Sequence, residues 1–264
     1  MSLIKLDVDA NHVATIRFNS PGTLNSMSVA VVEEFREALK EAEKSARAMV
    51  LTGEGRAFCS GAALGGGGAA GGTAPSGPPD AGSVLASHFN PLMVQLRDLS
   101  IPFVTAVHGA AAGVGCSLAL IGDLIVADST AYFLQAFRNI GLVPDGGSPY
   151  LLASAAGRAR AMEAMLLGER IVAETAYQWG MVNRLVPEGK DIEVATELAT
   201  KLADGPSQTL GLIRKLAWGA LDKSFEEQLD AERHTQKIAG QGREFREGVA
   251  AFLQKRKANF RNLA

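Results

Sequence analysis

One carboxylate among apolar neighbours is the first feature of the sequence that could do chemistry. Asp145 lies in the segment Asn139-Ile-Gly-Leu-Val-Pro-Asp145-Gly-Gly147, close in sequence to Phe137, Leu142 and Val143. Apolar surroundings take water away from a carboxylate, and this loss of solvation raises its pKa toward neutrality. A carboxylate with a raised pKa can accept a proton and then return it near neutral pH. The pattern therefore favours proton transfer by one acid–base residue.

The same segment also fits a structural role. The order Pro-Asp-Gly-Gly before a predicted helix is typical of an N-terminal cap. In such a cap the Asp145 side chain accepts a hydrogen bond from an N–H group two or three residues further on. Local sequence leaves both roles open, and one residue could serve in both.

Two turns built from small residues could supply a second element of chemistry. Ser60-Gly-Ala-Ala63 and Gly109-Ala-Ala-Ala-Gly-Val-Gly115 each follow an apolar run. Glycine lets a ligand approach the backbone closely, and unpaired N–H groups at a helix start carry partial positive charge. Two such turns at neighbouring strand ends could direct two N–H groups at one oxygen and form an oxyanion hole. The alternative is that the glycines only end strands and let elements pack, and periodicity does not show whether the turns meet.

Other kinds of site are disfavoured. Gly113-Val-Gly115 begins a dinucleotide fingerprint, but Leu118 occupies the third glycine position, and no phosphate-loop lysine is present. Cys59 and Cys116 are interpreted as small core fillers. Four histidines share no spacing typical of metal ligands: His12, His88, His108 and His234. We therefore expect no metal ion and no redox cofactor.

Composition narrows the class of protein. The 264 residues are 47% hydrophobic and 20% charged, which is typical of a soluble globular protein. A net charge of -2 argues against a general attraction to nucleic acid or to a membrane. No apolar run reaches the ~18 residues of a membrane span, and the first residues resemble a strand, not a signal peptide. Two cysteines provide no disulfide framework, so we expect a cytoplasmic protein.

Short apolar runs and helical spacings alternate along the first part of the chain. Predicted strands cover residues 2–8, 12–18, 47–52, 102–107, 123–127 and 131–133, and predicted helices cover 29–44, 83–98, 115–121, 146–156, 158–167 and 173–179. The first two strands read as a hairpin, and the later alternation predicts an α/β core with parallel pairing. The glycine-rich segment 65–82 is predicted to be a surface loop.

The character of the sequence changes after Val186. Residues 190–256 have helical spacing almost throughout, with breaks at Gly205-Pro206 and Gly240-Gln-Gly242. We therefore predict a strand-containing core over residues 1–190 and a helical region over residues 191–264.

Four segments together resemble one family. They are Phe58-Cys-Ser-Gly-Ala-Ala-Leu64, Ala106-Val-His-Gly-Ala-Ala-Ala-Gly-Val-Gly115, Gly141-Leu-Val-Pro-Asp-Gly-Gly147 and Ala173-Glu-Thr-Ala-Tyr-Gln-Trp-Gly-Met-Val182. In order and spacing they resemble the crotonase superfamily, the enoyl-CoA hydratase/isomerase fold, over nearly the whole chain. The resemblance implies a ClpP/crotonase-like spiral of ββα units that holds an acyl-CoA site. It also implies that the C-terminal helices serve in trimerisation.

The resemblance also assigns roles to residues. It implies that the backbone N–H groups of Ala62 and Val114 form the oxyanion hole, although Val114 replaces a common glycine. Asp145 falls where isomerases of the family carry their acid–base carboxylate. The two glutamates of the family's hydratases correspond to Ser117 and Phe137, so both carboxylates are absent.

Further residues are predicted to contact the acyl-CoA substrate. They are Leu24, Ala63, Leu64, His88, Ser117, Phe137, Leu142, Lys255 and Phe260. Ala63 stands where the family usually has an aspartate that organises the following loop. Lys255 and Phe260 would contribute to the CoA pocket of a neighbouring subunit, and a solvated charge run around Lys255 remains the alternative.

The predicted function is that of an isomerase that shifts a double bond in an acyl-CoA. Phe137-Arg-Asn-Ile-Gly-Leu-Val-Pro-Asp145, Ala156-Gly-Arg-Ala-Arg-Ala-Met162 and Arg243-Glu-Phe-Arg-Glu-Gly-Val-Ala-Ala-Phe252 resemble the phenylacetate-degradation isomerases of the family. Those enzymes convert a ring-epoxide phenylacetyl-CoA to its oxepin form and also move enoyl-CoA double bonds. The resemblance further implies a homotrimer or hexamer. An enoyl-CoA hydratase that uses Asp145 with Ser117 or water, and an inactive acyl-CoA-binding scaffold, remain open as alternatives.

Overall fold

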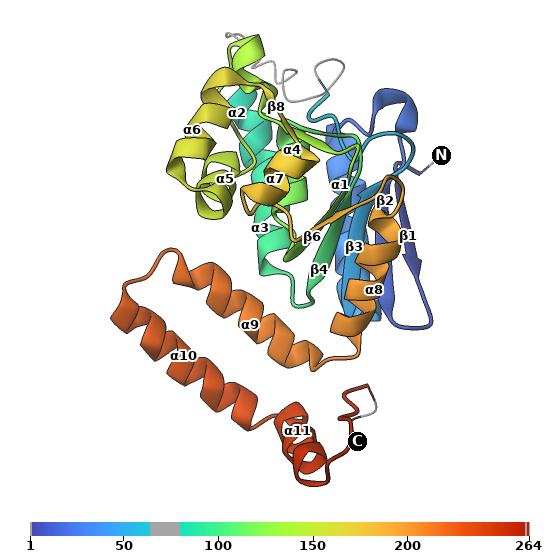
Figure 1. The fold of residues 1–264 in the computed structure, drawn as a ribbon, viewed down its shortest axis with the longest axis vertical. Coiled ribbons are helices and arrows are strands. Elements are labelled where there is room, and N and C mark those ends of the chain that lie inside the picture. Colours follow the sequence, from blue (N-terminus) through green and yellow to red (C-terminus); the bar gives the residue numbers. More distant parts are fainter. Residues whose placement is uncertain (1, 64–79, 262, 264) are drawn as a thin grey trace.

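Two β-sheets with helices packed around them form the main body of the protein (Figure 1). The structure is a computed structural model that describes residues 2–63, 80–261 and 263. Leu64, predicted to contact substrate, and residues 65–79 of the predicted surface loop lie outside the described residues. The fold is the α/β fold predicted from the sequence.

The larger sheet has six strands in the order β1-β2-β3-β4-β6-β9. Their bounds are β1 Ile4–Val8, β2 Val13–Phe18, β3 Ala48–Gly53, β4 Phe103–Val107, β6 Leu124–Asp128 and β9 Arg184–Val186. β1 and β2 form the predicted antiparallel hairpin, and the remaining pairs are parallel. β9 was not predicted, because three residues are too few to show an alternating pattern.

A smaller sheet has three strands in the order β5-β7-β8. The bounds are β5 Ala110–Ala112, β7 Tyr132–Leu134 and β8 Arg170–Val172. β5 lies inside the segment that was predicted to be only a turn. Alanine has a low β propensity, so the strand exists because β7 pairs with it and not because of its own residues.

Helices occupy most of the remaining described chain. Those before residue 190 are α1 Val29–Ser45, α2 Ala81–Val84, α3 Asn90–Asp98, α4 Val114–Leu120, α5 Ser148–Ala156, α6 Arg158–Leu167 and α7 Ala173–Gln178. Shorter segments are the 3₁₀ helices η1 Pro21–Thr23 and η3 Ala136–Ile140, and the π-helix η2 Leu85–Phe89. α1 begins with a side-chain cap, because Ser28 Oγ accepts the N–H of Val31 at 3.3 Å.

Both faces of the larger sheet are covered, as expected for parallel strands. α1 packs its apolar side, including Phe35 and Leu39, into the main core on one face. α8, Asp191–Ala203, lies on the other face, with Ala195, Ala199 and Ala203 against strand residues. The division at residue 190 stays a prediction, but the helix directly after it packs on the sheet. Small side chains at a four-residue spacing let this helix approach the strands closely.

The last three helices form an arm that extends away from the sheets (Figure 1). They are α9 Ser207–Ala220, α10 Phe225–Gly240 and α11 Arg243–Leu253, so both predicted breaks are confirmed. A further break before Phe225 was missed, although Ser224 and Glu227 form a capping box there. Large apolar side chains of the arm are exposed, among them Phe225, Phe245 and Phe252, the last at 82%.

Membrane insertion can be judged from the helices that the structure describes. Within residues 2–63, 80–261 and 263, no helix combines the length and the apolar character that crossing a bilayer requires.

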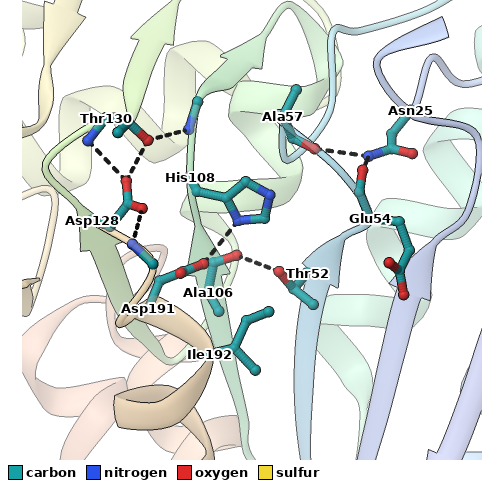
Figure 2. Close-up of polar contacts among 12 residues, drawn as sticks. Asn25, Thr52, Glu54, Ala57, Ala106, His108, Asp128, Thr130, Asp191 and Ile192 are labelled. Atoms are coloured by element: carbon teal, nitrogen blue, oxygen red, sulfur yellow. Dashed lines mark hydrogen bonds and ion pairs between the residues drawn. The ribbon is translucent and has the colours of Figure 1, made fainter. Parts of the chain in front are cut away.

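Polar contacts at the carboxyl ends of the strands fix where the second small-residue turn begins (Figure 2). His108 Nδ1 lies 2.8 Å from Asp191 Oδ2 at the start of α8. The N–H of Gly109 donates to Thr130 Oγ1 at 3.1 Å, and that hydroxyl donates to Asp128 Oδ1 at 2.6 Å. His108 is therefore bonded to α8, and Gly109, the first residue of the turn, is bonded through Thr130 to the end of β6.

The His108–Asp191 pair makes this attachment sensitive to pH. Burial alone lowers the pKa of His108, but the hydrogen bond to Asp191 and the charges of Asp191 and Asp128 outweigh it and raise the pKa above its usual 6.5. A raised histidine pKa stabilises the folded protein below the unfolded pKa, and this stabilisation is lost as pH rises through the folded pKa.

The substitution Asp191→Asn should therefore reduce the pH dependence of stability. Between pH 6 and pH 8 the wild-type free energy of unfolding should fall more than that of the variant. Urea unfolding at both pH values measures this difference. Glu193→Gln is the matched control, because its carboxylate lies in the same first turn but pairs with exposed Lys190. An equal pH dependence in Asp191→Asn and wild type would contradict the expectation.

Candidate active site

The two small-residue turns meet in the structure. Cys59 accepts the N–H of Ala112 and donates to Ala110 O, both at 2.9 Å, so the first turn runs beside β5. A Cβ atom added at Gly61 would lie 2.7 Å from Ala112 O, and one added at Gly113 would lie 3.8 Å from Gly61 Cα. The backbones of Gly61 and Gly113 therefore face each other, which periodicity could not show.

The N–H group of Ala62 points toward this meeting place and away from its own strand partner. Met27 donates to Gly61 O at 2.8 Å and accepts the N–H of Ala63 at 3.0 Å. Successive N–H groups alternate in direction along an extended segment. Since Ala63 directs its N–H at Met27, Ala62 directs its own to the opposite side.

The N–H group of Val114 belongs to the first turn of α4. Such groups have no acceptor within the helix. Gly113 is the N-cap residue and has no side chain with which to bond them, and its φ of 54° is one that glycine adopts without strain. Val114 is itself buried, so its side chain packs into the core and anchors the helix start. The N–H groups of Ala62 and Val114 thus each follow one of the two glycines that face each other, Gly61 and Gly113.

Asp145 is held by a tight turn against the same helix. Gly146 and Gly147 have φ values of 59° and 77°, and the N–H of Ser148 donates to Asp145 O at 3.1 Å. Two left-handed central residues define a type I′ turn, which favours glycine at both positions. A Cβ atom at Gly146 would lie 2.9 Å from Val114 Cγ2 and 3.0 Å from Ser117 Oγ. The turn therefore packs directly on the start of α4.

The carboxyl group of Asp145 is partly buried. Its Oδ1 atom is buried and has no hydrogen-bond partner within the described part of the chain. Burial raises the pKa of Asp145 from 3.8 to about 6, which confirms the predicted direction. The predicted cause is wrong in part, because Leu142 and Val143 are exposed. The capping role is not seen, because α5 begins at Ser148 with Gly147 as its N-cap and no side-chain cap bond.

Ser117 and Phe137 bring no carboxylate to this place. Ser117 is fully buried, and its Oγ lies 2.6 Å from Ser148 Oγ and donates to Asp145 O at 3.2 Å. Its hydroxyl is therefore satisfied within the protein and touches the acid's own backbone. The Phe137 ring is buried, with Cζ 3.8 Å from the position a Cβ atom would take at Gly113.

Two more of the predicted contact residues, Leu24 and Ala63, belong to the first turn or contact it, and a third, Leu142, does not. Leu24 has a left-handed φ of 53°, and its carbonyl accepts the N–H of Ser60 at 2.9 Å. Asn25 holds this unusual backbone, because its buried amide donates to Ala57 O at 2.7 Å and Glu54 O at 2.9 Å (Figure 2). Ala63 bonds to Met27, as described above. Leu142 follows η3 and is exposed.

The structure brings the remaining predicted contact residues to other places. His88 has its two ring nitrogens 2.7 Å from Ser87 Oγ and 3.5 Å from Glu33 Oε1, so it contacts the exposed side of α1. Lys255 and Phe260 follow α11, at the far end of the molecule from α5 (Figure 1). Within one chain they do not reach Asp145.

A cavity of about 400 Å³ opens beside Gly146 and Gly147. Its apolar lining comes from α3, α5 and α9 and from the end of α4, and comprises Met93, Val94, Ile121, Leu151 and Trp218. The Trp218 ring stacks on Tyr150 at a centroid distance of 6.3 Å. Charged side chains also line the cavity: Arg97, Asp98, Lys215 and Asp222. Sequence reasoning missed this cavity, because no local pattern links α9 to the Asp145 turn.

The two cysteines lie in the core near the turns. Both are fully buried, and burial raises the pKa of each thiol to about 12. They stay protonated at neutral pH, in agreement with their interpretation as core fillers. Among the side chains that the structure describes, no group of three metal-binding types is placed to hold an ion.

The fold and the paired backbone turns define the class of protein. The chain belongs to the enoyl-CoA hydratase/isomerase family, whose profile matches residues 9–262. It is 41% identical to the 1,2-epoxyphenylacetyl-CoA isomerase of Escherichia coli K12 and 39% identical to a probable enoyl-CoA hydratase of Rhodobacter capsulatus, in each case over 94% of both chains.

Solved structures show the same fold. An enoyl-CoA hydratase from Bacillus anthracis superposes with a TM-score of 0.90 at 27% identity, over 98% of this chain and 99% of that one. An enoyl-CoA hydratase from Polaromonas sp. JS666 gives a TM-score of 0.88 at 32% identity, over 98% and 99%. The crotonase fold is therefore established over almost the full length.

The raised pKa of Asp145 predicts a stability effect. Ionising this carboxyl group costs stability as pH rises from 3.8 to about 6, and the cost stays constant above that. Asp145→Asn should therefore be more stable than wild type at pH 8 by on the order of 1 kcal/mol, after allowing for partial solvation, and equally stable near pH 4. Urea unfolding at the two pH values tests this, and a pH-independent difference would contradict it.

Proposed function

We propose that this protein is an acyl-CoA isomerase that shifts a double bond of an enoyl thioester. One observation carries the proposal: a single desolvated carboxylate, Asp145, is held against α4, and the N-cap residue of that helix, Gly113, lies beside Gly61 in the turn of Ala62. One acid–base group beside two backbone donors suits a reaction in which one proton leaves and returns.

The reaction uses no co-reactant. The Asp145 carboxylate removes a proton from the γ- or α-carbon of the thioester, and the electron pair of that C–H bond moves into a conjugated dienolate. Negative charge then rests on the thioester oxygen, where the N–H groups of Ala62 and Val114 stabilise it. The protonated carboxyl returns the same proton to the carbon two positions away. The product has the mass of the substrate.

Hydration is the second candidate, supported by the 39% identity to a probable enoyl-CoA hydratase. It needs a group that activates water as well as one that delivers a proton to the α-carbon. The hydroxyl of Ser117 is engaged with Ser148 and Asp145, and Phe137 has no acid function. The inward bonding of Ser117 therefore favours isomerisation.

The acyl group of the substrate would occupy the cavity beside Gly146 and Gly147. Its apolar and aromatic lining, with Tyr150 stacked on Trp218, suits a ring or a medium-length chain. A ring-epoxide phenylacetyl-CoA fits this description, and the E. coli relative is named for a substrate of that kind.

The apolar arm supports assembly into a homotrimer or hexamer through residues 191–264. Exposed residues such as Phe245 and Phe252 would be covered by a neighbouring subunit. In that arrangement Lys255 and Phe260 would reach the CoA of the neighbour.

An assay in heavy-oxygen water distinguishes the candidate activities. Wild-type protein supplied with a 3-enoyl-CoA should form the 2-enoyl isomer without change of mass, because no water enters the product. Asp145→Asn should retain acyl-CoA binding but lose ~10²–10⁴-fold in kcat, the range typical of an acid–base residue. Mass spectrometry of the products provides the measurement.

Each other outcome would overturn the proposal in a different way. Incorporation of one labelled oxygen from a 2-enoyl-CoA as the main reaction would identify a hydratase. Binding without turnover of either substrate would identify a scaffold. Unchanged turnover in Asp145→Asn would remove Asp145 from the mechanism.

A proline at position 114 tests the second backbone donor. Proline is tolerated at the first position of a helix, where its missing N–H has no helical acceptor. Val114→Pro should therefore fold but lose about 10²–10³-fold in kcat, the usual cost of one oxyanion donor. Val114→Ala is the matched control, since it loses buried methyl groups but keeps the N–H. Equal kcat values for folded Pro and Ala variants would exclude the donor role.

A further inference from the structure

We infer that the buried Ser117–Ser148 pair positions the acid of this site by keeping the buried carboxylate oxygen of Asp145, Oδ1, free of hydrogen-bond donors from the protein. The inference rests on the proposed function and extends it to two residues that would touch no substrate. Both serines are fully buried, and both belong to the contact between α4 and the Asp145 turn.

The direction of the hydrogen bonds follows from counting protons. Ser117 Oγ is 3.2 Å from Asp145 O, and a carbonyl oxygen can only accept, so Ser117 uses its one proton there. The Oγ atoms of Ser117 and Ser148 are 2.6 Å apart. Ser148 must therefore donate to Ser117. The chain of bonds runs from Ser148 to Ser117 to the main-chain carbonyl of Asp145.

This chain of bonds uses the hydroxyl protons of both serines. The N–H of Ser148 also donates to Asp145 O, at 3.1 Å. An aspartate in this position would ordinarily accept such an N–H or a hydroxyl with its side chain, as a helix cap does. Here the N–H of Ser148 donates to the backbone carbonyl of Asp145, and the hydroxyl of Ser148 donates to Ser117 Oγ. Asp145 Oδ1 is left buried without a partner within the described part of the chain.

The absence of donors matters because a hydrogen bond to a carboxylate favours its charged form and lowers its pKa. Burial alone raises the pKa of Asp145 to about 6, and no charged group contributes to that shift. Charged side chains line the adjoining cavity: Arg97 and Asp98 on α3, Lys215 on α9, and Asp222 after α9. None of them is among the causes of the pKa shift of Asp145. Cys116 on α4 also adds no charge, because burial raises the pKa of its thiol to about 12 and keeps it protonated.

The pair also links the acid to the oxyanion donor. Ser117 lies one turn along α4 from Val114, and Gly146 packs against both side chains. The bond from Ser117 to Asp145 O therefore fixes the acid relative to the helix whose first N–H would bind the thioester oxygen. Removing the serines should change kcat more than KM, because substrate binding uses other contacts.

A comparison of three variants tests the inference: Ser117→Ala, Ser148→Ala and the double variant. In Ser117→Ala the hydroxyl of Ser148 loses its acceptor, and the inference predicts that it then donates to the Asp145 carboxylate. The pKa of Asp145, measured by carbon-13 NMR of its carboxyl group, should then fall by at least one unit, and kcat should fall ~10-fold or more with KM nearly unchanged. In the double variant no hydroxyl remains, so the pKa should return close to the wild-type value and kcat should recover in part.

Ser154→Ala is the matched control. It removes a serine of α5 whose hydroxyl bonds only to Tyr150 O, at 2.8 Å on the exposed side, so pKa and kcat should stay at wild-type values. Ser148→Ala keeps the bond from Ser117 to Asp145 O and should show no fall in the pKa of Asp145. Thermal unfolding confirms that each variant is folded before it is compared.

The outcomes separate this inference from the proposed function. An unchanged Asp145 pKa in folded Ser117→Ala, or an equal fall in the single and double variants, would overturn the inference even if wild type is an active isomerase. A wild type without isomerase activity would overturn the proposed function, while the NMR titration would still decide whether the serines keep donors away from Asp145.

Discussion

The close approach of two backbones, at Gly61 and Gly113, is the constraint on which the rest of the site depends. Any side chain at Gly61 would collide with the carbonyl of Ala112, and Gly61 has a φ of 99°, where other residues are strained. Three features bring these two turns together. They are the larger sheet, the pairing of Cys59 with β5, and the hydrogen bonds of His108 to Asp191 and of Gly109 to Thr130. Once they meet, two N–H groups from distant parts of the chain share one neighbourhood.

The pKa of Asp145 is raised because its surroundings bury the carboxyl group and give its Oδ1 atom no hydrogen-bond donor within the described residues. Around Asp145 the hydroxyl and N–H groups bond to one another and to the main chain, and its carboxyl group is left with burial as the dominant influence. An isolated carboxylate is costly to bury, so the type I′ turn and the packing of Gly146 on α4 must hold it in place. The burial that raises the pKa of Asp145 for proton transfer therefore also lowers the stability of the folded protein.

Much of this could be predicted from the sequence, and the failures have physical causes. The apolar segment around Asp145 indicated a raised pKa, and the buried runs indicated β3, β4 and β6. β5, β8 and β9 were missed because each has only three residues, too few to show a pattern, and is recognised only by its pairing with a neighbouring strand. The cavity beside Gly146 was missed because Trp218 reaches it from α9 through tertiary packing. Whether the turns meet, and whether Asp145 caps α5, depended on contacts between segments far apart in sequence.

The arm of α9, α10 and α11 has a consequence for how the protein is made. Its exposed phenylalanines follow the strands of both sheets in the sequence, so they leave the ribosome after those strands. Domains generally fold in the order of synthesis, so both sheets can close before this adhesive surface emerges. The growing chain can therefore hold a folded body before its exposed phenylalanines make it prone to association.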